Sequence, residues 1–400
     1  MAAAFYLSHL HEVTLFEQDS RLGGHTNTVM VNSSRGPLPV DTGFIVHNRV
    51  TYPAFCKLMK ELDVATQPSD MSFAVTDRRS YEYSSRGIAG YFAQPSNLAR
   101  PGHYALLAEI VRFNREAKSI LQRPGAETLT LGEAMAAGRY SRNFIDRYLY
   151  PTAAAVWSMP PSKMDDFPTA TLIRFFDNHG LLAIRNHPQW YTITGGSHAY
   201  IPKLTAPYRD RIHLNTQLLS VSRTGAGVRL RIQGHEALTF DEVVFACHGD
   251  QILPLLTDAT EREREVLGSF QTTANRACLH TAGKMLPVRK RARASWNYLL
   301  GDRGNVTLTY HMNRLQALNV PEDYCVTLNR DTAISPGRAI ARMTYRHPVY
   351  DQAAIRAQSR WAEISGHGHT HFCGAYWLYG FHEDGVQSAL RVAGTLGVNL

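Results

Sequence analysis

The segment that most restricts the fold of this chain is residues 11–28. "EVTLFE" is rich in residues that favour strands, and it ends at an acidic residue, Glu17. The turn "DSRLGGHTNT" follows at once, and Gly23 and Gly24 permit a backbone path that a side chain would block. In a dinucleotide-binding β-α-β unit, the acidic residue that closes the second strand binds ribose hydroxyls. The segment therefore predicts a nucleotide site with Glu17 on the ribose and Arg21 placed to meet phosphate charge.

The same kind of α/β pattern returns in the middle and at the end of the chain. "IHLNTQLLSVSR", "GVRLRI" and "EVVFACH" are typical of strands, and "FCGAYWLYGFHEDGVQSALRVAGTL" predicts a strand, a glycine turn and a helix. Helical patterns occupy "YPAFCKLMKELDV" and "HYALLAEIVRFNREAKSIL", and "LPVDTGFIVHN" predicts one strand. We expect an α/β protein with a discontinuous nucleotide domain (1–50, 195–254 and 366–400) and an inserted α+β domain (51–194 and 255–365).

Composition narrows the class of protein further. Apolar residues make up 44% of the 400 residues and charged residues 19%, which is typical of a globular chain. The net charge of +8 is spread along the sequence, so no nucleic-acid partner is expected. The run "PVRKRARA" predicts a solvated loop before "SWNYLL", because it carries no aromatic residues for stacking on bases.

Cysteine usage and hydropathy bear on the compartment. The five cysteines are scattered and form no CxxC pair, which fits a reducing cytoplasm and indicates neither a zinc site nor a disulfide framework. The sequence contains no run of 18 apolar residues, so no transmembrane segment is predicted. Peripheral contact with a membrane stays open. "HGHTH" predicts a polar loop in preference to a metal site.

Several motifs together resemble the FAD-dependent amine-oxidase-type flavoproteins. They are the acidic strand end followed by Arg-x-Gly-Gly, "VDTGFIVHN", "TGGSHAYIPKL", "FDEVVFACHG" and "YGFHEDGVQSALRVAG". More narrowly, "DTGFIVHNRVTYPAF" and "GAYWLYGFHEDG" resemble a bacterial subfamily of NAD/FAD-binding oxidoreductases. The resemblance implies a Rossmann-like FAD-binding domain, an inserted substrate domain and FAD as the cofactor.

The resemblance also implies which residues lie near the flavin. By position these are Asp41, Thr42, Gly43, Glu383, Asp384, Gly385 and Val386. A helix N-terminus attracts electron-rich oxygens, so the amides of Gly385 and Val386 are expected at the pyrimidine edge.

The chain departs from the family pattern in two places. The closing helix has Ser388-Ala389 where the family usually carries Ser-Gly, and a methyl group there is expected to crowd the packing against the cofactor. The family begins with a strand and a Gly-x-Gly-x-x-Gly loop, whereas this chain begins inside the helix that follows. We expect that the chain is a truncated product or that its start was assigned downstream of the true one; the alternative is a chain without tight FAD binding.

The chemistry is expected to come from the flavin, since the sequence shows neither a nucleophile elbow nor HExxH. His382, Tyr376 and Trp377 are the catalytic candidates, and His179 is expected to be structural. Other candidate wall residues of the substrate cavity are Trp157, Phe175, Phe176 and Tyr345. Aromatic walls suit an apolar or lipid-like small molecule, or an amine held between rings.

The predicted function is hydride transfer from an amine or apolar substrate to FAD. Two alternatives stay open: a desaturase or isomerase acting on a lipid or isoprenoid, and a non-catalytic binding protein that kept the fold but lost the cofactor. The sequence gives no oligomeric state.

Overall fold

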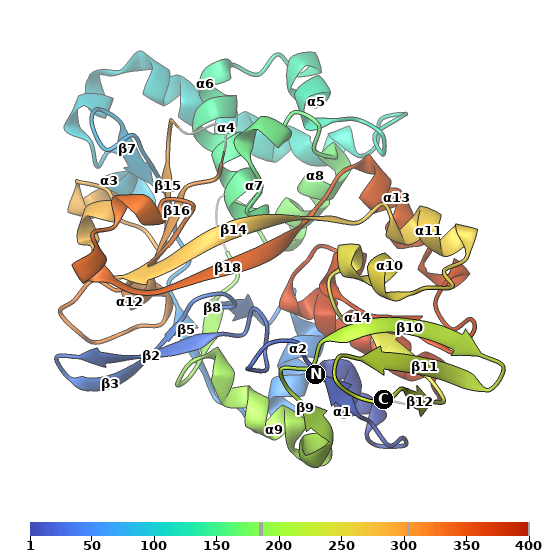
Figure 1. The fold of residues 1–400 in the computed structure, drawn as a ribbon. Coiled ribbons are helices and arrows are strands. Elements are labelled where there is room, and N and C mark those ends of the chain that lie inside the picture. The colour runs from blue at the N-terminus through green and yellow to red at the C-terminus, as the bar shows by residue number, and fades with distance from the viewer. Residues whose placement is uncertain (184–186, 302–304, 399–400) are drawn as a thin grey trace.

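The structure is a computed structural model that describes residues 1–183, 187–301 and 305–398. Its largest sheet has seven strands in the order β18-β14-β17-β16-β15-β6-β7. Only β6 and β15 pair in parallel in this sheet. The two longest strands, β14 and β18, cross the middle of the molecule (Figure 1). The bounds are β6 (Phe73–Thr76), β7 (Glu82–Ser84), β14 (Gln271–His280), β15 (Trp296–Leu299), β16 (Leu308–His311), β17 (Cys325–Leu328) and β18 (Ala339–Val349).

Helices cover one face of this sheet, and a hairpin covers the other. The helices are α4 (Pro101–Ile120), α5 (Leu131–Ala137), α6 (Arg142–Phe144), α7 (Tyr150–Trp157) and α8 (Thr169–Asn178). Their core includes the fully buried Leu106, Phe113 and Phe144 packed with Leu308 of the sheet. The hairpin of β2 (Thr28–Ser33) and β3 (Gly36–Asp41) packs through Val31 and Val40 on the opposite face.

Local sequence explains why these helices begin where they do. Pro101 occupies the first position of α4, where its missing N–H has no intrahelical partner to lose. α5 begins after Thr130, whose hydroxyl accepts the Glu133 N–H while the Glu133 carboxylate accepts the Thr130 N–H at 2.9 Å. The sequence-based prediction of α4 is confirmed.

The first, middle and last parts of the chain join in a second region. β1 (Leu15–Phe16) pairs in parallel with β9 (Ile212–His213), and β13 (Val243–Phe245) pairs in parallel with β19 (Thr370–Phe372). β10 (Leu218–Thr224), β11 (Gly227–Ile232) and β12 (Leu238–Phe240) form an antiparallel sheet at the edge of this region. The strand predicted over "EVTLFE" is real, but only two of its residues are paired. The domain boundaries remain a prediction.

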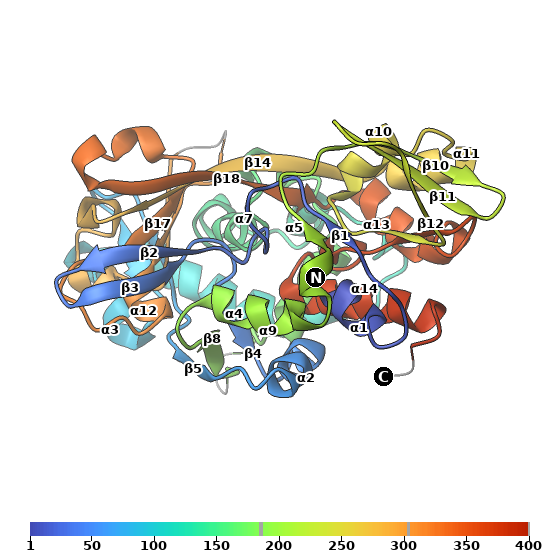
Figure 2. The same ribbon diagram turned by 60° about the horizontal axis from the view of Figure 1, so that its bottom comes forward.

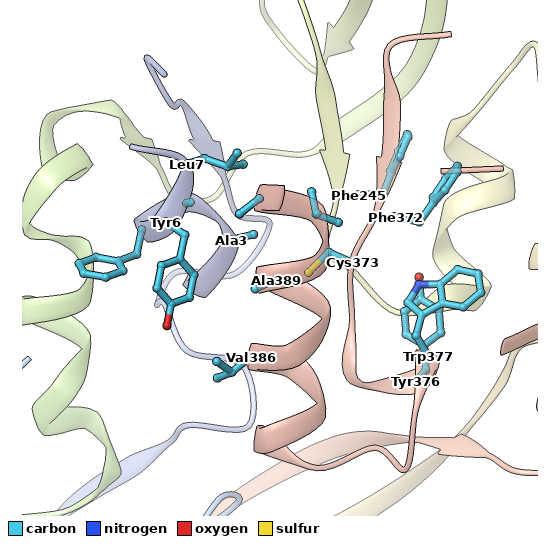
Figure 3. Packing of buried hydrophobic residues seen from close by; sticks show 14 of the residues in the cluster. Ala3, Tyr6, Leu7, Phe245, Phe372, Cys373, Tyr376, Trp377, Val386 and Ala389 are labelled. Carbon is cyan, nitrogen blue, oxygen red and sulfur yellow. The ribbon is translucent and has the colours of Figure 1, made fainter. Parts of the chain in front are cut away.

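The closing helix α14 (His382–Thr395) lies against α1 (Ala2–Leu7) (Figures 1 and 2). Figure 3 shows Ala3, Tyr6 and Leu7 of α1 on one side of α14, with the Tyr376 and Trp377 rings on the other side. Ala389 is buried in this cluster, while the Gly374 N–H donates to the neighbouring Ser388 hydroxyl at 2.9 Å.

The prediction of one strand over "LPVDTGFIVHN" is wrong. β3 ends at Asp41, and β4 (His47–Asn48) starts a separate sheet with β8 (Trp190–Ile193) and β5 (Thr66–Ser69). Between β3 and β4 the backbone bonds to the glycine turn: the Thr42 N–H donates to Asn27 O at 2.9 Å and the Phe44 N–H to His25 O at 2.7 Å. Both bonds keep the residue pairing of the β2–β3 hairpin, so the chain leaves the hairpin only after Phe44, and His47 then pairs with Tyr191 of β8.

The remaining helices are α2 (Pro53–Glu61), α3 (Gly87–Tyr91), α9 (Ile201–Thr205), α10 (Ile252–Leu255), α11 (Glu261–Leu267), α12 (Met312–Leu315) and α13 (Gln352–Ser359). Within the described ranges, no helix is both long and apolar enough to cross a membrane.

Candidate functional site

A cavity of about 2830 Å³ lies where the two regions meet. Small-molecule pockets typically have volumes of about 300–1,000 Å³, so this cavity has room for a dinucleotide and a substrate together. α1, the end of β1, the glycine turn, residues 246–251 and the start of α14 line one part of it. α3, α4, α7, α8 and the strands of the large sheet contribute to the walls of the other part.

The predicted nucleotide residues gather along the first part of the cavity. Glu17, Arg21, Gly23 and Gly24 all line it. The Arg21 guanidinium donates to the carbonyl oxygens of Gly24 at 2.7 Å and Thr26 at 3.3 Å, which holds the turn closed. Gly23 (φ +109°) and Gly24 (φ +55°) have left-handed backbones, and a Cβ atom on Gly23 would collide with the Thr26 carbonyl oxygen.

The Asp41 side chain is buried in a network of hydrogen bonds and does not line the cavity. Its carboxylate accepts hydrogen bonds from the Thr28 hydroxyl at 2.5 Å, the Ser197 N–H at 2.8 Å and the Gln316 amide at 3.0 Å. Burial raises the pKa of Asp41 to about 6 although the hydrogen bonds from Thr28 and Ser197 oppose the rise. Asp41 therefore ties the hairpin to the Gly195–Gly196 turn and to the residue that follows α12.

The next two residues of the Asp-Thr-Gly segment differ in their exposure to the cavity. The Thr42 hydroxyl donates to Asn27 O at 2.9 Å and hydrogen-bonds to Tyr345 Oη at 2.7 Å, and Thr42 does not line the cavity. Gly43 does line it, and a Cβ atom there would collide with the His25 carbonyl oxygen. Only glycine fits this close approach of two backbone segments.

The two acidic residues at the start of α14 stabilise helix ends. The Glu383 carboxylate accepts the N–H groups of Ala54 at 3.1 Å and Phe55 at 2.8 Å, which are free donors in the first turn of α2. The Asp384 carboxylate accepts the Phe381 N–H at 2.8 Å and so caps α14 itself. Burial raises the pKa of Asp384 to about 7. Neither side chain lines the cavity.

His382, Gly385 and Val386 do line the cavity, at the first turns of α14. The Gly385 N–H donates to Phe381 O at 3.0 Å, so it is already part of the helix. His382 Nε2 hydrogen-bonds to the Thr26 hydroxyl at 3.0 Å, and its ring stacks on Phe44 with centroids 3.6 Å apart. Burial lowers the pKa of His382 to about 3, which keeps the imidazole neutral.

The aromatic candidates divide between wall and core. Trp157, Phe175, Tyr345 and Tyr376 line the cavity, whereas Phe176 and Trp377 are buried away from it. Burial raises the pKa of Tyr376 well above its ordinary value. His179 lines the cavity with its Nδ1 bonded to Phe175 O at 3.0 Å, which agrees with the structural role expected for it.

Sequence reasoning missed a group of imidazoles on the cavity wall. His25 lies 5.1 Å from His347 and 6.2 Å from His248 between ring centroids, and its ring also faces Tyr345 at 4.9 Å. Burial lowers the pKa of His25 well below its ordinary range and that of His347 to about 4. The three residues come from distant parts of the sequence, so no local pattern links them.

The residues of the first part of the cavity fit FAD. Left-handed glycines leave the backbone of the turn close to the cavity, and Glu17 and Arg21 offer a ribose acceptor and a phosphate donor on the same wall. Residues 11–28 and the start of α14 meet directly through the bond between Thr26 and His382. Glu17, Arg21, Gly23, Gly24 and Gly43 would hold the nucleotide, which supplies hydride acceptance when it is bound.

Comparisons with solved structures show the same fold at low sequence identity. Cyclohexylamine oxidase from Brevibacterium oxydans IH-35A superposes with a TM-score of 0.69 at 15% identity, covering 99% of this chain and 96% of that one. Putrescine oxidase bound to putrescine gives 0.70 at 12% identity, with the same coverage. The CLA-producing fatty acid isomerase from P. acnes superposes with a TM-score of 0.68 at 14% identity, covering 99% of this chain and 96% of that one.

A search of curated proteins found no match to the sequence. The sequence profile described as "Flavin containing amine oxidoreductase" matches residues 1–307. The chain therefore belongs to the flavin containing amine oxidoreductase family, and it is an FAD-dependent oxidoreductase with a Rossmann-like FAD-binding domain and a substrate domain.

Proposed function

We propose that this enzyme transfers a hydride to FAD from an uncharged, apolar substrate. One observation carries the proposal. Among the described residues of segments 51–194 and 255–365 that line the cavity, none is acidic. The only arginine or lysine among them is Arg346, which donates to the Asp250 carboxylate at 2.6 Å. A cationic diamine would enter this part of the cavity without a carboxylate partner, which burial makes unfavourable.

The side chains of this wall suit an apolar molecule. They include Tyr83, Tyr91, Trp157, Phe175, Trp190 and Tyr350, and Tyr379 and Phe381 of the segment before α14 adjoin Phe175. Phe175 stacks on Phe381 with centroids 4.8 Å apart and meets Trp157 at 4.9 Å, so the rings form a continuous apolar surface. A neutral amine packed between these rings is the second candidate, favoured by the family and by the likeness to cyclohexylamine oxidase.

The residues around the predicted flavin position hold the cavity in shape. His382 stays neutral above a pH of about 3 and orients the Thr26 hydroxyl, which also bonds to Tyr200. Tyr345 Oη bonds to Thr42 and accepts from the Asn27 amide at 2.9 Å, and so positions the Asp-Thr-Gly segment. We assign His382 a positioning role, and we keep the division into 1–50, 195–254 and 366–400 against 51–194 and 255–365 as part of the proposal.

The test is flavin reduction without oxygen. The purified protein is mixed anaerobically with an unsaturated long-chain fatty acyl ester, cyclohexylamine or putrescine, and the flavin absorbance is followed. We expect bleaching by the acyl ester and none by putrescine. Bleaching by putrescine alone would contradict the proposal, and bleaching by cyclohexylamine alone would establish the second candidate.

His382→Gln separates positioning from base catalysis, because glutamine keeps a neutral group that can bond to Thr26. We expect the reduction rate of both proteins to be flat from pH 6 to 9, since the pKa of His382 is about 3. A wild-type rate that rises with pH in this range and becomes flat in the variant would make His382 a base.

A further inference from the structure

Four segments form one surface at the end of the molecule opposite β10, as both views of the ribbon show for α3 (Figures 1 and 2). They are α3, the 3-10 turn Pro95–Ala99, the first turns of α4, and the 3-10 turn Lys290–Ala292 inside the basic run. Arg289 Nε donates to the Gln94 amide oxygen at 3.3 Å, and the Arg86 guanidinium donates to Arg293 O at 3.5 Å. These bonds join the basic run to α3.

We call this surface the α3 patch, and several of its large apolar side chains are highly exposed to solvent. Ile88 is 82% exposed, Leu98 59% and Val288 57%. Tyr104 and Leu107 on α4 are also exposed. Single exposed apolar residues are ordinary, but a group of them on one surface indicates a binding partner.

The cavity reaches the protein surface at the α3 patch. Ile88 and Leu107 are exposed to solvent and line the cavity at the same time. Tyr91, Phe92, Ile110 and Val111 continue the lining inward from α3 and α4. An apolar path therefore runs from the α3 patch to the interior.

The charge of the α3 patch has one sign. Residues 83–108 and 287–301 contain no Asp or Glu, and they carry Arg86, Arg100, Arg289, Lys290, Arg291 and Arg293, of which Arg293 forms an ion pair with Asp323 at 3.3 Å. The side chains of Arg289, Lys290 and Arg291 are exposed. A cationic rim around exposed apolar residues is complementary to a surface that is anionic outside and apolar beneath.

We propose that the α3 patch docks on an anionic lipid bilayer, with its apolar side chains in the interface and the cavity opening against the lipid. A nucleic acid would match the basic residues but would leave Ile88, Leu98 and Val288 without an apolar partner. The proposal is compatible with the apolar substrate proposed above but does not depend on it, because vesicle binding is measured without turnover.

The first test is sedimentation with large vesicles of phosphatidylcholine, alone or with phosphatidylglycerol. We expect binding to the anionic vesicles that weakens with salt. Arg289→Gln/Lys290→Gln/Arg291→Gln should reduce the partition coefficient on the order of 100-fold. Leu98→Ser/Val288→Ser should reduce it roughly tenfold. The matched controls lie on the distant sheet: Arg229→Gln/Arg231→Gln for charge and Leu219→Ser/Leu238→Ser for apolar surface, and both should bind as the wild type does.

The second test locates the contact. Leu98→Trp places a fluorophore on the α3 patch, and vesicles with brominated acyl chains should quench it, whereas Leu219→Trp should show no added quenching over the wild type. Absence of vesicle binding by the wild type would overturn the proposal. So would equal loss of binding in the control variants, or binding of a DNA duplex that the triple variant abolishes while vesicles are ignored.

Discussion

Glu383, at the start of α14, can be assigned either of two roles, and a substitution can decide between them. The resemblance places this carboxylate near the flavin, whereas the structure uses it to accept two N–H groups of α2, from Ala54 and Phe55. Each hydrogen bond to a charged group contributes about 1.5–3 kcal/mol, and a carboxylate at a helix N-terminus adds roughly 0.3–1 kcal/mol. Glu383 is also buried, so water cannot replace a hydrogen bond that the N–H groups of α2 lose.

Glu383→Gln should therefore lower the free energy of unfolding by about 2–4 kcal/mol. The amide keeps one acceptor oxygen, but its NH₂ group faces a backbone N–H and the negative charge is lost. A domain is stable by only about 5–15 kcal/mol, so this loss is large enough to measure. The assay is urea unfolding of the flavin-free protein, followed by a titration with FAD.

Gln387→Ala is the matched control. Gln387 is exposed and donates to the same carboxylate at 2.8 Å, but it leaves both bonds to α2 in place. We expect the control to change stability by less than about 1 kcal/mol. If Glu383→Gln leaves the flavin-free protein as stable as the wild type and weakens only FAD binding, the helix-capping argument is refuted.

Three further predictions test two parts of the site and one buried ion pair outside it. The pKa of Asp384 is raised from 3.8 to about 7, so its contribution to stability is full below pH 3.8 and is lost as pH rises through about 7; urea unfolding of Asp384→Asn should lack that decline, and an identical pH slope would contradict it. Gly43→Ala should lower the melting temperature and flavin content more than Gly24→Ala, because a Cβ atom on Gly43 would collide with the His25 carbonyl oxygen, whereas a Cβ atom on Gly24 would meet nothing within 4 Å and only the left-handed backbone of Gly24 (φ +55°) opposes the substitution. Arg223→Met leaves the buried Glu263 carboxylate without its ion-pair partner and should destabilise the protein by about 3–5 kcal/mol in chemical denaturation; a change below 1 kcal/mol would show that the pair is not needed.

The sequence was informative wherever the determinant is local. The helix of residues 101–120, the glycine turn after Glu17 and the helix after residue 381 each depend on residues a few positions apart. The resemblance added the order of these motifs along the chain, and the family assignment and FAD as cofactor are confirmed. The strand predicted over residues 38–48 was wrong, because its first residues pair with β2 in the hairpin whereas His47 and Asn48 pair with β8 in a separate sheet.

The roles of the site carboxylates were decided by the tertiary structure. Asp41 and Glu383 were expected near the flavin, yet one ties three separate segments together and the other caps α2. The sequence also did not predict that the imidazoles of His25, His248 and His347 lie together, or that the basic run packs against α3. In both cases the partners come from distant parts of the chain. Local spacing fixes which face of a strand or helix a residue occupies. The atom that a buried carboxylate or imidazole finally meets depends on which distant segments pack together, because an unpaired polar group in the interior is too unfavourable to persist.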